Sequence, residues 1–195
     1  MNVFTKKVFD KKAQKRKSPL LFQKGLSLIE ASMVLALSAI VVSGVMYYYQ
    51  AASDNNKTQT TVSEVMSIVS AINGLYVGTS GYAGLSQSVI YNTSAVPENY
   101  KASNQKIMHP FGGEVKLGPT NNNSKYYIIL EDVPRGPCVN LASMNLGTSL
   151  AGVGVGVDEK TAQGSNWMPK DKVLSPKLAS DLCKEDANKI AFLLK

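Results

Sequence analysis

One long apolar run near the start of the chain dominates the hydrophobic pattern. Residues 31–49 include no charged residue and no proline, and only serines and one glycine interrupt the run. As a helix rising about 1.5 Å per residue, this run spans roughly 28 Å, close to the thickness of the hydrocarbon core of a bilayer. The pattern predicts a membrane-spanning helix.

The same helix is predicted to continue beyond the membrane. No proline occurs between Pro19 and Pro97, and polar residues 53–57 mark the exit from the bilayer. Apolar residues then recur at spacings of three and four, as in an amphipathic helix: Val62, Val65, Met66, Val69, Ile72 and Tyr76. The predicted helix runs from Leu26 to about Leu75, and its second half must pack on a domain.

The remaining residues predict an α+β domain built on an antiparallel sheet. Residues 114–117 and 125–131 alternate around a turn at 118–124 and predict a hairpin. A long connection (77–110) with a short helix or turn near 85–90 precedes the hairpin, and a helix at 138–146, a strand at 153–157 and a polar stretch at 158–174 follow it. A second helix is predicted to start at Ser175-Pro176, with Leu178, Ala179, Leu182 and Cys183 on its inner face. The last predicted element is a strand at 190–194 inside the sheet.

The positive charge of the chain lies almost entirely before the apolar run. The formal net charge is +7, and residues 1–25 account for all of it, with eight Lys and Arg against Asp10. The remaining residues carry thirteen basic and thirteen acidic side chains. This distribution removes the main argument for nucleic-acid binding and, by the positive-inside rule, leaves the N-terminus cytoplasmic.

Everything after the apolar run then faces an oxidising compartment, in which Cys138 and Cys183 predict one disulfide. Neither cysteine has a Cys or His nearby at metal-ligand spacing. The bond would enclose a surface lobe that includes Trp167. A cleaved secretory signal explains the first fifty residues poorly, because the apolar run is too long and Ala51-Ala52-Ser53 is a weak cleavage site.

The junction of the basic segment and the apolar run resembles the type IV pilins. Their precursors carry a basic leader that ends in glycine, a cut before a hydrophobic residue, and a glutamate at the fifth mature position; Lys24-Gly25, Leu26 and Glu30 match these features. The long leader and the leucine after the cut resemble the type IVb branch. Further segments, 70–76, 92–97 and 110–114, also resemble this branch, so the resemblance covers residues 24–150.

The resemblance implies a cleaved leader (1–25), a hydrophobic transmembrane and assembly half of the helix (26–52) and a periplasmic or extracellular globular domain (53–195). It implies cleavage between Gly25 and Leu26 and N-methylation of Leu26 by a prepilin peptidase that is also the methyltransferase. It also assigns assembly to Glu30. The implied fold is the type IV pilin fold, with the long helix packed on the sheet and a disulfide-bounded C-terminal region.

Glu30 has a second explanation. Ser27 and Glu30 match a capping box, and a glutamate in the first turn is favoured by the helix dipole whatever its function. Capping does not explain the glycine and the basic leader directly upstream, so both interpretations stay open at this point.

We find no residues in the sequence arranged for catalysis, cofactor binding or metal binding. The single histidine, His109, precedes Pro110 in a predicted loop, where we expect it to be solvated. A signal-anchored periplasmic enzyme or binding protein is therefore the weakest of three hypotheses.

The leading hypothesis is the major subunit of a type IVb pilus, used for adhesion or aggregation. Its expected partners are copies of itself, the peptidase, the inner-membrane assembly machinery, a secretin and, before assembly, inner-membrane lipid. The expected locations are the inner membrane and then the surface filament. A minor pilin, a secretion pseudopilin or a conjugative pilus subunit is the alternative.

Overall fold

The computed structural model describes residues 27–164 and 173–195. The chain divides into two compact units, residues 1–45 and 46–195, and the long helix α1 (Leu28–Leu75) contributes to both. In the described part of the chain, α1 is the one helix that is long and apolar enough to cross a membrane. The predicted end of this helix near Leu75 is confirmed.

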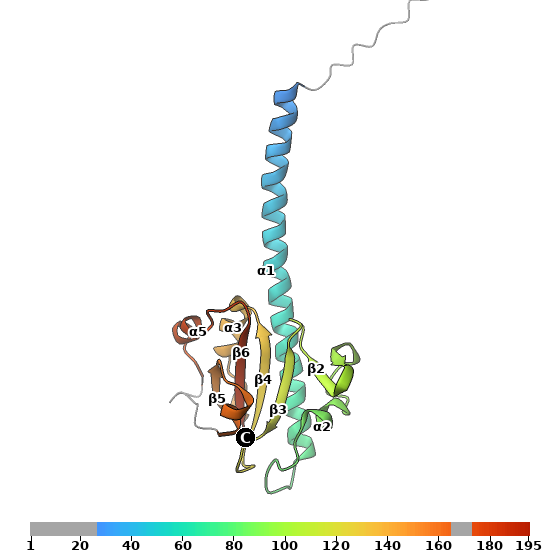
Figure 1. Ribbon diagram of the computed structural model, residues 1–195, viewed down its shortest axis with the longest axis vertical. Coiled ribbons are helices and arrows are strands. Elements are labelled where there is room, and N and C mark those ends of the chain that lie inside the picture. Colours follow the sequence, from blue (N-terminus) through green and yellow to red (C-terminus); the bar gives the residue numbers. More distant parts are fainter. Residues whose placement is uncertain (1–26, 165–172) are drawn as a thin grey trace, which may run out of the picture. The chain divides into compact units, whose positions relative to one another are not determined.

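An antiparallel sheet forms the centre of the second unit (Figure 1). The described residues form six strands in the order β1-β2-β3-β4-β6-β5, so the last strand of the chain lies inside the sheet, as predicted. The predicted hairpin is β3 and β4. The strand bounds are β1 Lys101–Ala102, β2 Lys106–Met108, β3 Glu114–Pro119, β4 Tyr126–Val133, β5 Leu150–Val155 and β6 Asn188–Leu194.

Short helices fill the connections between the strands. They are α2 (Gln87–Tyr91), α3 (Arg135–Ala142), α4 (Glu159–Gly164), α5 (Pro176–Leu182) and the 3-10 turns η1 (Glu98–Tyr100), η2 (Ser103–Gln105) and η3 (Gly147–Ser149). The pattern of the sequence did not predict β1, β2 or α4. Two or three residues are too few to show an alternation, and α4 begins at a polar cap, where the Asp158 side chain accepts a hydrogen bond from the Thr161 backbone N–H.

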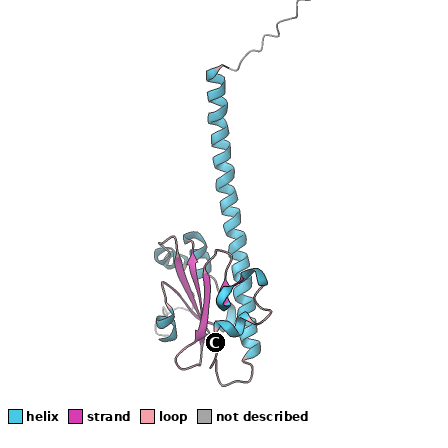
Figure 2. Cartoon of the chain, turned by 45° about the vertical axis from the view of Figure 1, so that its right-hand side comes forward, coloured by secondary structure: helices cyan, strands magenta, loops and turns pink. Residues whose placement is uncertain are grey.

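The main core lies between the second half of α1 and one face of the sheet. Figures 1 and 2 show this part of α1 running along the sheet. Ile68 and Ile72 of α1 are completely buried in the same cluster as Ile128, Leu130 and Phe192 from β4 and β6. Because the strands alternate, Tyr127, Ile129 and Leu193 point to the other face, where they form a smaller cluster with Ala162 of α4.

The prediction that Met66 lies on the inner face of α1 is wrong. Met66 is 46% exposed, whereas Ile68, which was not in the predicted set, is buried. The face that packs on the sheet carries Val65, Ile68, Val69 and Ile72, at spacings of three and four, and Met66 is turned about 100° from Val65. The spacing of apolar residues alone is compatible with two neighbouring faces of the helix, one with Met66 and one with Ile68. The position of the sheet decides which of the two faces is buried.

The helix predicted at 138–146 begins earlier and ends earlier. α3 runs over Arg135–Ala142, with Pro134 as N-cap and Pro137 in the first turn. The first turn tolerates proline because its backbone N–H groups have no acceptor within the helix. The predicted helix began after these prolines, whereas in the structure they lie at its start.

Two of the four residues predicted on the inner face of α5 are buried, and the other two are exposed. Ser175 caps the helix by accepting a hydrogen bond from the Leu178 N–H, and Pro176 opens it, both as predicted. Ala179 and Cys183 are fully buried, but Leu178 is 41% exposed and Leu182 is 43% exposed. Each leucine immediately precedes a buried residue and is therefore rotated about 100° away from the core.

A carboxylate is buried without a partner on the inner face of α1. Glu64 is 5% exposed, and in the described part of the chain neither carboxylate oxygen accepts a hydrogen bond. Burial raises the pKa of Glu64 to about 7, from 4.5 for an unperturbed glutamate. Because Glu64 binds a proton more tightly in the folded domain than in the unfolded chain, its protonation stabilises the domain. This stabilisation is fully present below about pH 4.5 and is lost as the pH rises through 7.

We predict that Glu64→Gln stabilises the domain above pH 7, by about 3 kcal/mol, because the amide carries no charge to desolvate. At pH 4, where Glu64 is protonated in both states, the gain should be small. Urea unfolding at several pH values measures this difference. The exposed Glu185→Gln serves as a control and should show no such gain, and equal pH dependence of Glu64→Gln and wild type would contradict the prediction.

Candidate assembly site

The first half of α1 presents an apolar surface all around its circumference. Its large hydrophobic side chains are between 57% and 87% exposed. They are Leu28, Ile29, Met33, Val34, Leu35, Leu37, Ile40, Val41, Val42, Val45, Met46, Tyr47, Tyr48 and Tyr49. Such a surface is stable only in lipid or against other apolar protein surfaces.

The serines in this run do not disturb its apolar character. Ser32, Ser38 and Ser43 each donate a hydrogen bond to a backbone carbonyl three or four residues earlier, at 2.8, 2.7 and 2.9 Å. A hydroxyl that is bonded within its own helix needs no water, so it lowers the cost of placing the helix in an apolar environment.

Glu30 is the one charged residue in the apolar half of α1. It lies in the first turn and is exposed. Its Oε2 atom accepts a hydrogen bond of 3.3 Å from the Ser27 backbone N–H, which is one half of the capping box. This contact is long for a hydrogen bond, and among the described residues no ion pair of Glu30 is present.

Gly25 and Leu26, the two residues at the predicted cleavage position, lie outside the described residues. Leu26 would carry a new α-amino group after cleavage, and Glu30 follows it by four residues in sequence. In a helix this spacing places two residues on the same face. The predicted site would therefore combine one carboxylate and one amine at the start of the apolar run.

A disulfide closes the C-terminal region. Cys138 of α3 and Cys183, immediately after α5, are bonded, as predicted, with their Cα atoms 5.9 Å apart. Both cysteines are fully buried in the main core. Trp167, which we expected in the enclosed lobe, lies outside the described residues.

The prediction of a solvated His109 is wrong. The residue is 2% exposed, and its Nε2 atom lies 2.6 Å from the Glu131 carbonyl oxygen of β4. The Phe111 backbone N–H donates to Nδ1 at 3.3 Å, so Nε2 carries the proton that is donated to Glu131. Burial lowers the pKa of His109, which keeps the ring neutral in this arrangement.

His109 thereby fixes the tip between β2 and β3 to Glu131 of β4, where the pairing of β4 with β6 is irregular between Leu130 and Val133. The His109 N–H also donates to the Gly113 carbonyl, and the Gly112 N–H donates to the His109 carbonyl, which closes the tip as a tight turn. Gly113 packs so closely on β4 that any side chain there would collide with the Glu131 carbonyl oxygen. Sequence reasoning missed this role because the partner of the histidine is a backbone atom 22 residues away.

In the described part of the chain, no group of three or more His, Cys, Asp and Glu side chains is arranged to hold a metal ion. The features that stand out are instead structural: an apolar helix surface, a carboxylate at its start and a domain closed by a disulfide. A long helix with an apolar first half, followed by a domain with an antiparallel sheet and a C-terminal disulfide, defines the type IV pilin class.

Comparison with known proteins assigns the family within this class. The Bundlin family model matches residues 50–195, and the chain belongs to this family. The chain is also similar to two proteins named "Major structural subunit of bundle-forming pilus", from Escherichia coli O111:H- and from Escherichia coli O127:H6 (strain E2348/69 / EPEC). Each is 47% identical over 184 residues, which cover 89% of this chain and 95% of the relative.

We predict that replacing both cysteines by serine lowers the free energy of unfolding by about 4 kcal/mol, because the bond closes a loop of 45 residues. Urea unfolding of the oxidised, reduced and doubly substituted proteins measures the effect. Reduced wild type should behave like the double variant. Equal stability of oxidised and reduced wild type would contradict the role assigned to the bond.

Proposed function

We propose that this chain is the major structural subunit of a type IVb pilus and has no enzymatic role. The observation that carries the proposal is the exposed apolar half of α1 in a member of the Bundlin family, because such a surface requires lipid or neighbouring subunits. The similarity to two major pilus subunits favours a major over a minor subunit.

The first stage of the proposed pathway is insertion in the inner membrane. The basic residues of the leader stay in the cytoplasm, residues 26–52 cross the bilayer and residues 53–195 fold on the far side. The prepilin peptidase then cuts after Gly25 and methylates the amino group of Leu26. The disulfide fits this topology, since it requires an oxidising compartment.

The second stage is transfer from lipid to a filament. The assembly machinery of the inner membrane moves the apolar helix out of the bilayer and against the helices of earlier subunits, and the growing pilus leaves through a secretin. Contacts of this kind join different surfaces of identical subunits, so they produce an open helical fibre and not a closed ring. The filament then acts outside the cell in adhesion or aggregation.

Glu30 directs this transfer in our proposal. A carboxylate at the centre of a membrane-spanning helix costs on the order of 3 kcal/mol on membrane-insertion scales, and one near the end of the helix, such as Glu30, costs less. The α-amino group of Leu26 on an incoming subunit offsets that cost when it pairs with Glu30 of a subunit already assembled. An ion pair is strengthened by the low dielectric constant of the filament interior, and it fixes the axial position of the new subunit.

We predict that the mature chain begins at N-methyl-Leu26. Intact mass measurement and N-terminal sequencing of protein from surface filaments test this directly. Replacing Gly25 by a bulkier residue should leave the uncut precursor in the membrane, because the peptidase needs a small residue before the cut. A mature protein that retains its leader, or one that starts near Asp54, would rule out the processing step.

We also predict that Glu30→Gln leaves cleavage and domain folding normal but reduces surface filaments to few or none. Glutamine still accepts the hydrogen bond from the Ser27 N–H, so capping is preserved while the charge is lost. Electron microscopy of sheared filaments and immunoblots of the subunit measure the two effects.

Asp54→Asn is the matched control, since it removes one carboxylate charge from α1 outside the apolar run. This variant should assemble normally. Filaments of wild-type number and length from Glu30→Gln cells would refute pairing and leave capping as the role of Glu30.

A further inference from the structure

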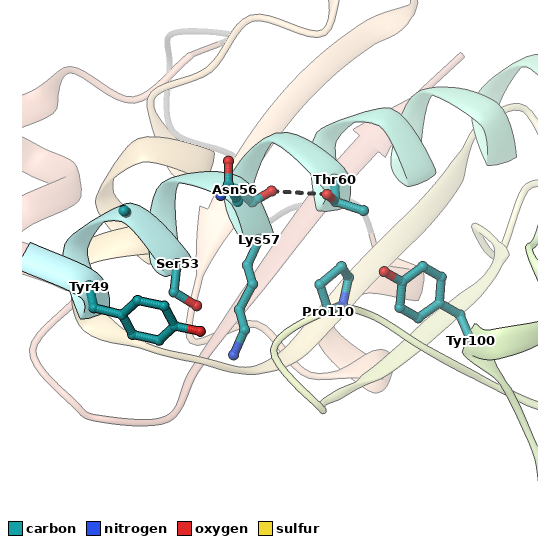
Figure 3. Close-up of a pocket in the computed structure, with 8 residues that line it drawn as sticks. Tyr49, Ser53, Asn56, Lys57, Thr60, Tyr100 and Pro110 are labelled. Carbon is teal, nitrogen blue, oxygen red and sulfur yellow. Dashed lines mark hydrogen bonds between the residues drawn. The ribbon is translucent and has the colours of Figure 1, made fainter. Parts of the chain in front are cut away.

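A groove lies along α1 just beyond its apolar half (Figure 3). It has a volume of about 360 Å³ and lies within the second unit of the chain. Six of its lining residues, among them Tyr49, Ser53 and Lys57, come from α1, and Tyr100 and Pro110 form the opposite wall. Figure 3 shows the side chains of Tyr49 and Lys57 projecting from the helix into this space.

The lining combines one cation with several hydroxyl groups. Lys57 is the one Lys, Arg, Asp or Glu side chain in the groove, and Tyr49, Ser53, Thr60 and Tyr100 bring hydroxyls. Lys57 is exposed and makes no ion pair in the described part of the chain. The Thr60 hydroxyl donates to the Asn56 carbonyl at 2.9 Å, so the donors that face a ligand are the Lys57 ammonium and the hydroxyls of Tyr49, Ser53 and Tyr100. This set, with no carboxylate in the lining to compete, is suited to a phosphate ester.

The tip between β2 and β3 contacts this lysine through the Phe111 ring. The Lys57 Nζ atom lies 5.9 Å from the centre of the Phe111 ring, a cation–π contact that leaves the N–H groups free for an anion. His109 anchors the tip that carries Pro110 and Phe111 through its contact with β4. The groove therefore has a fixed wall opposite the helix.

The position along α1 points to the membrane surface. Tyr47, Tyr48 and Tyr49 end the apolar run and are 77%, 77% and 71% exposed, as expected for tyrosines at a lipid–water boundary. Lys57 follows Tyr49 by eight residues, or about 12 Å of helix, and helical side chains point back toward the N-terminus. With a stem of about 6 Å, the ammonium falls in the headgroup layer, which is about 5 to 7 Å thick on each side.

The opposite flank of α1 has a different charge. There a second groove is lined by Asp54 and Thr58 of the helix and by Gly136, Pro137 and Asn140 of α3, and it includes a carboxylate but no lysine or arginine. A phosphate would be repelled from this side and attracted to the Lys57 side. The helix thus presents two chemically different faces at the same depth.

We propose that the Lys57 groove binds the phosphate of an anionic phospholipid from the outer leaflet of the inner membrane before the subunit enters a filament. The inference rests on the membrane stage of the proposed function. A carboxylate of a second subunit would satisfy the same ammonium, but the direct continuity of the groove with the lipid-facing tyrosines favours a lipid headgroup.

The test uses the full mature chain in bilayer nanodiscs that contain phosphatidylglycerol and phosphatidylcholine, followed by native mass spectrometry of the lipids retained. Wild type should retain phosphatidylglycerol preferentially. Lys57→Gln should retain it about fivefold less, as expected for one lysine near an anionic surface, and Lys57→Arg should restore it. Lys160→Gln, which removes an exposed lysine of α4 outside the groove, should match wild type.

Three results would overturn the proposal. The first is equal retention of phosphatidylglycerol by wild type and Lys57→Gln. If Lys57→Gln also loses filaments in that case, the groove is a contact between subunits. The second is displacement of phosphatidylglycerol by inorganic phosphate at the same concentration, which would make the ligand a free ion. The third is failure of wild type to insert in bilayers, which, unlike the first two, would also contradict the proposed function.

Discussion

The exposed apolar surface of α1 must be buried in lipid or against other protein, and this is the main physical constraint on the molecule. The large apolar side chains of residues 28–49 are exposed, and Ser32, Ser38 and Ser43 donate their hydroxyls to backbone carbonyls of the same helix. Lipid and neighbouring helices meet the requirement equally well, so a subunit can exchange one for the other at a modest cost in apolar burial. Because both surroundings are apolar, burial alone does not direct the proposed exchange, and in our proposal the charge of Glu30 gives it direction and register.

The domain that follows is held together by its own core and by a disulfide. The second half of α1 supplies Ile68 and Ile72 to a core shared with β4 and β6, and the disulfide ties α3 to the end of α5. His109 fixes the tip beside Lys57 to β4, and this tip forms one wall of the Lys57 groove. Glu64 has the opposite effect on the stability of the domain, because a buried carboxylate without a partner lowers stability at neutral pH. The structure shows no group that compensates for it within the described residues.

The features that follow from local pattern were predictable, and those that depend on a distant partner were not. The length of α1, the β3-β4 hairpin, the cap of α5 and the inner position of β6 follow from periodicity, turn residues and the absence of charge at 190–194. The burial of His109, the exposure of Met66 and the outward leucines of α5 depend on where the sheet lies. Gly25, Leu26 and Glu30 were identified through a family resemblance, because spacing alone allowed Glu30 to be only a helix cap.

The most direct test of this account is the distance between Glu30 of one subunit and the Leu26 nitrogen of its neighbour in the assembled filament. Electron cryomicroscopy of purified filaments, at a resolution that shows side chains, measures it. The account predicts that a carboxylate oxygen lies within about 4 Å of the neighbour's amine, the range of an ion pair. A filament in which Glu30 contacts only the Ser27 N–H of its own chain, with every neighbouring amine well beyond that range, would contradict it.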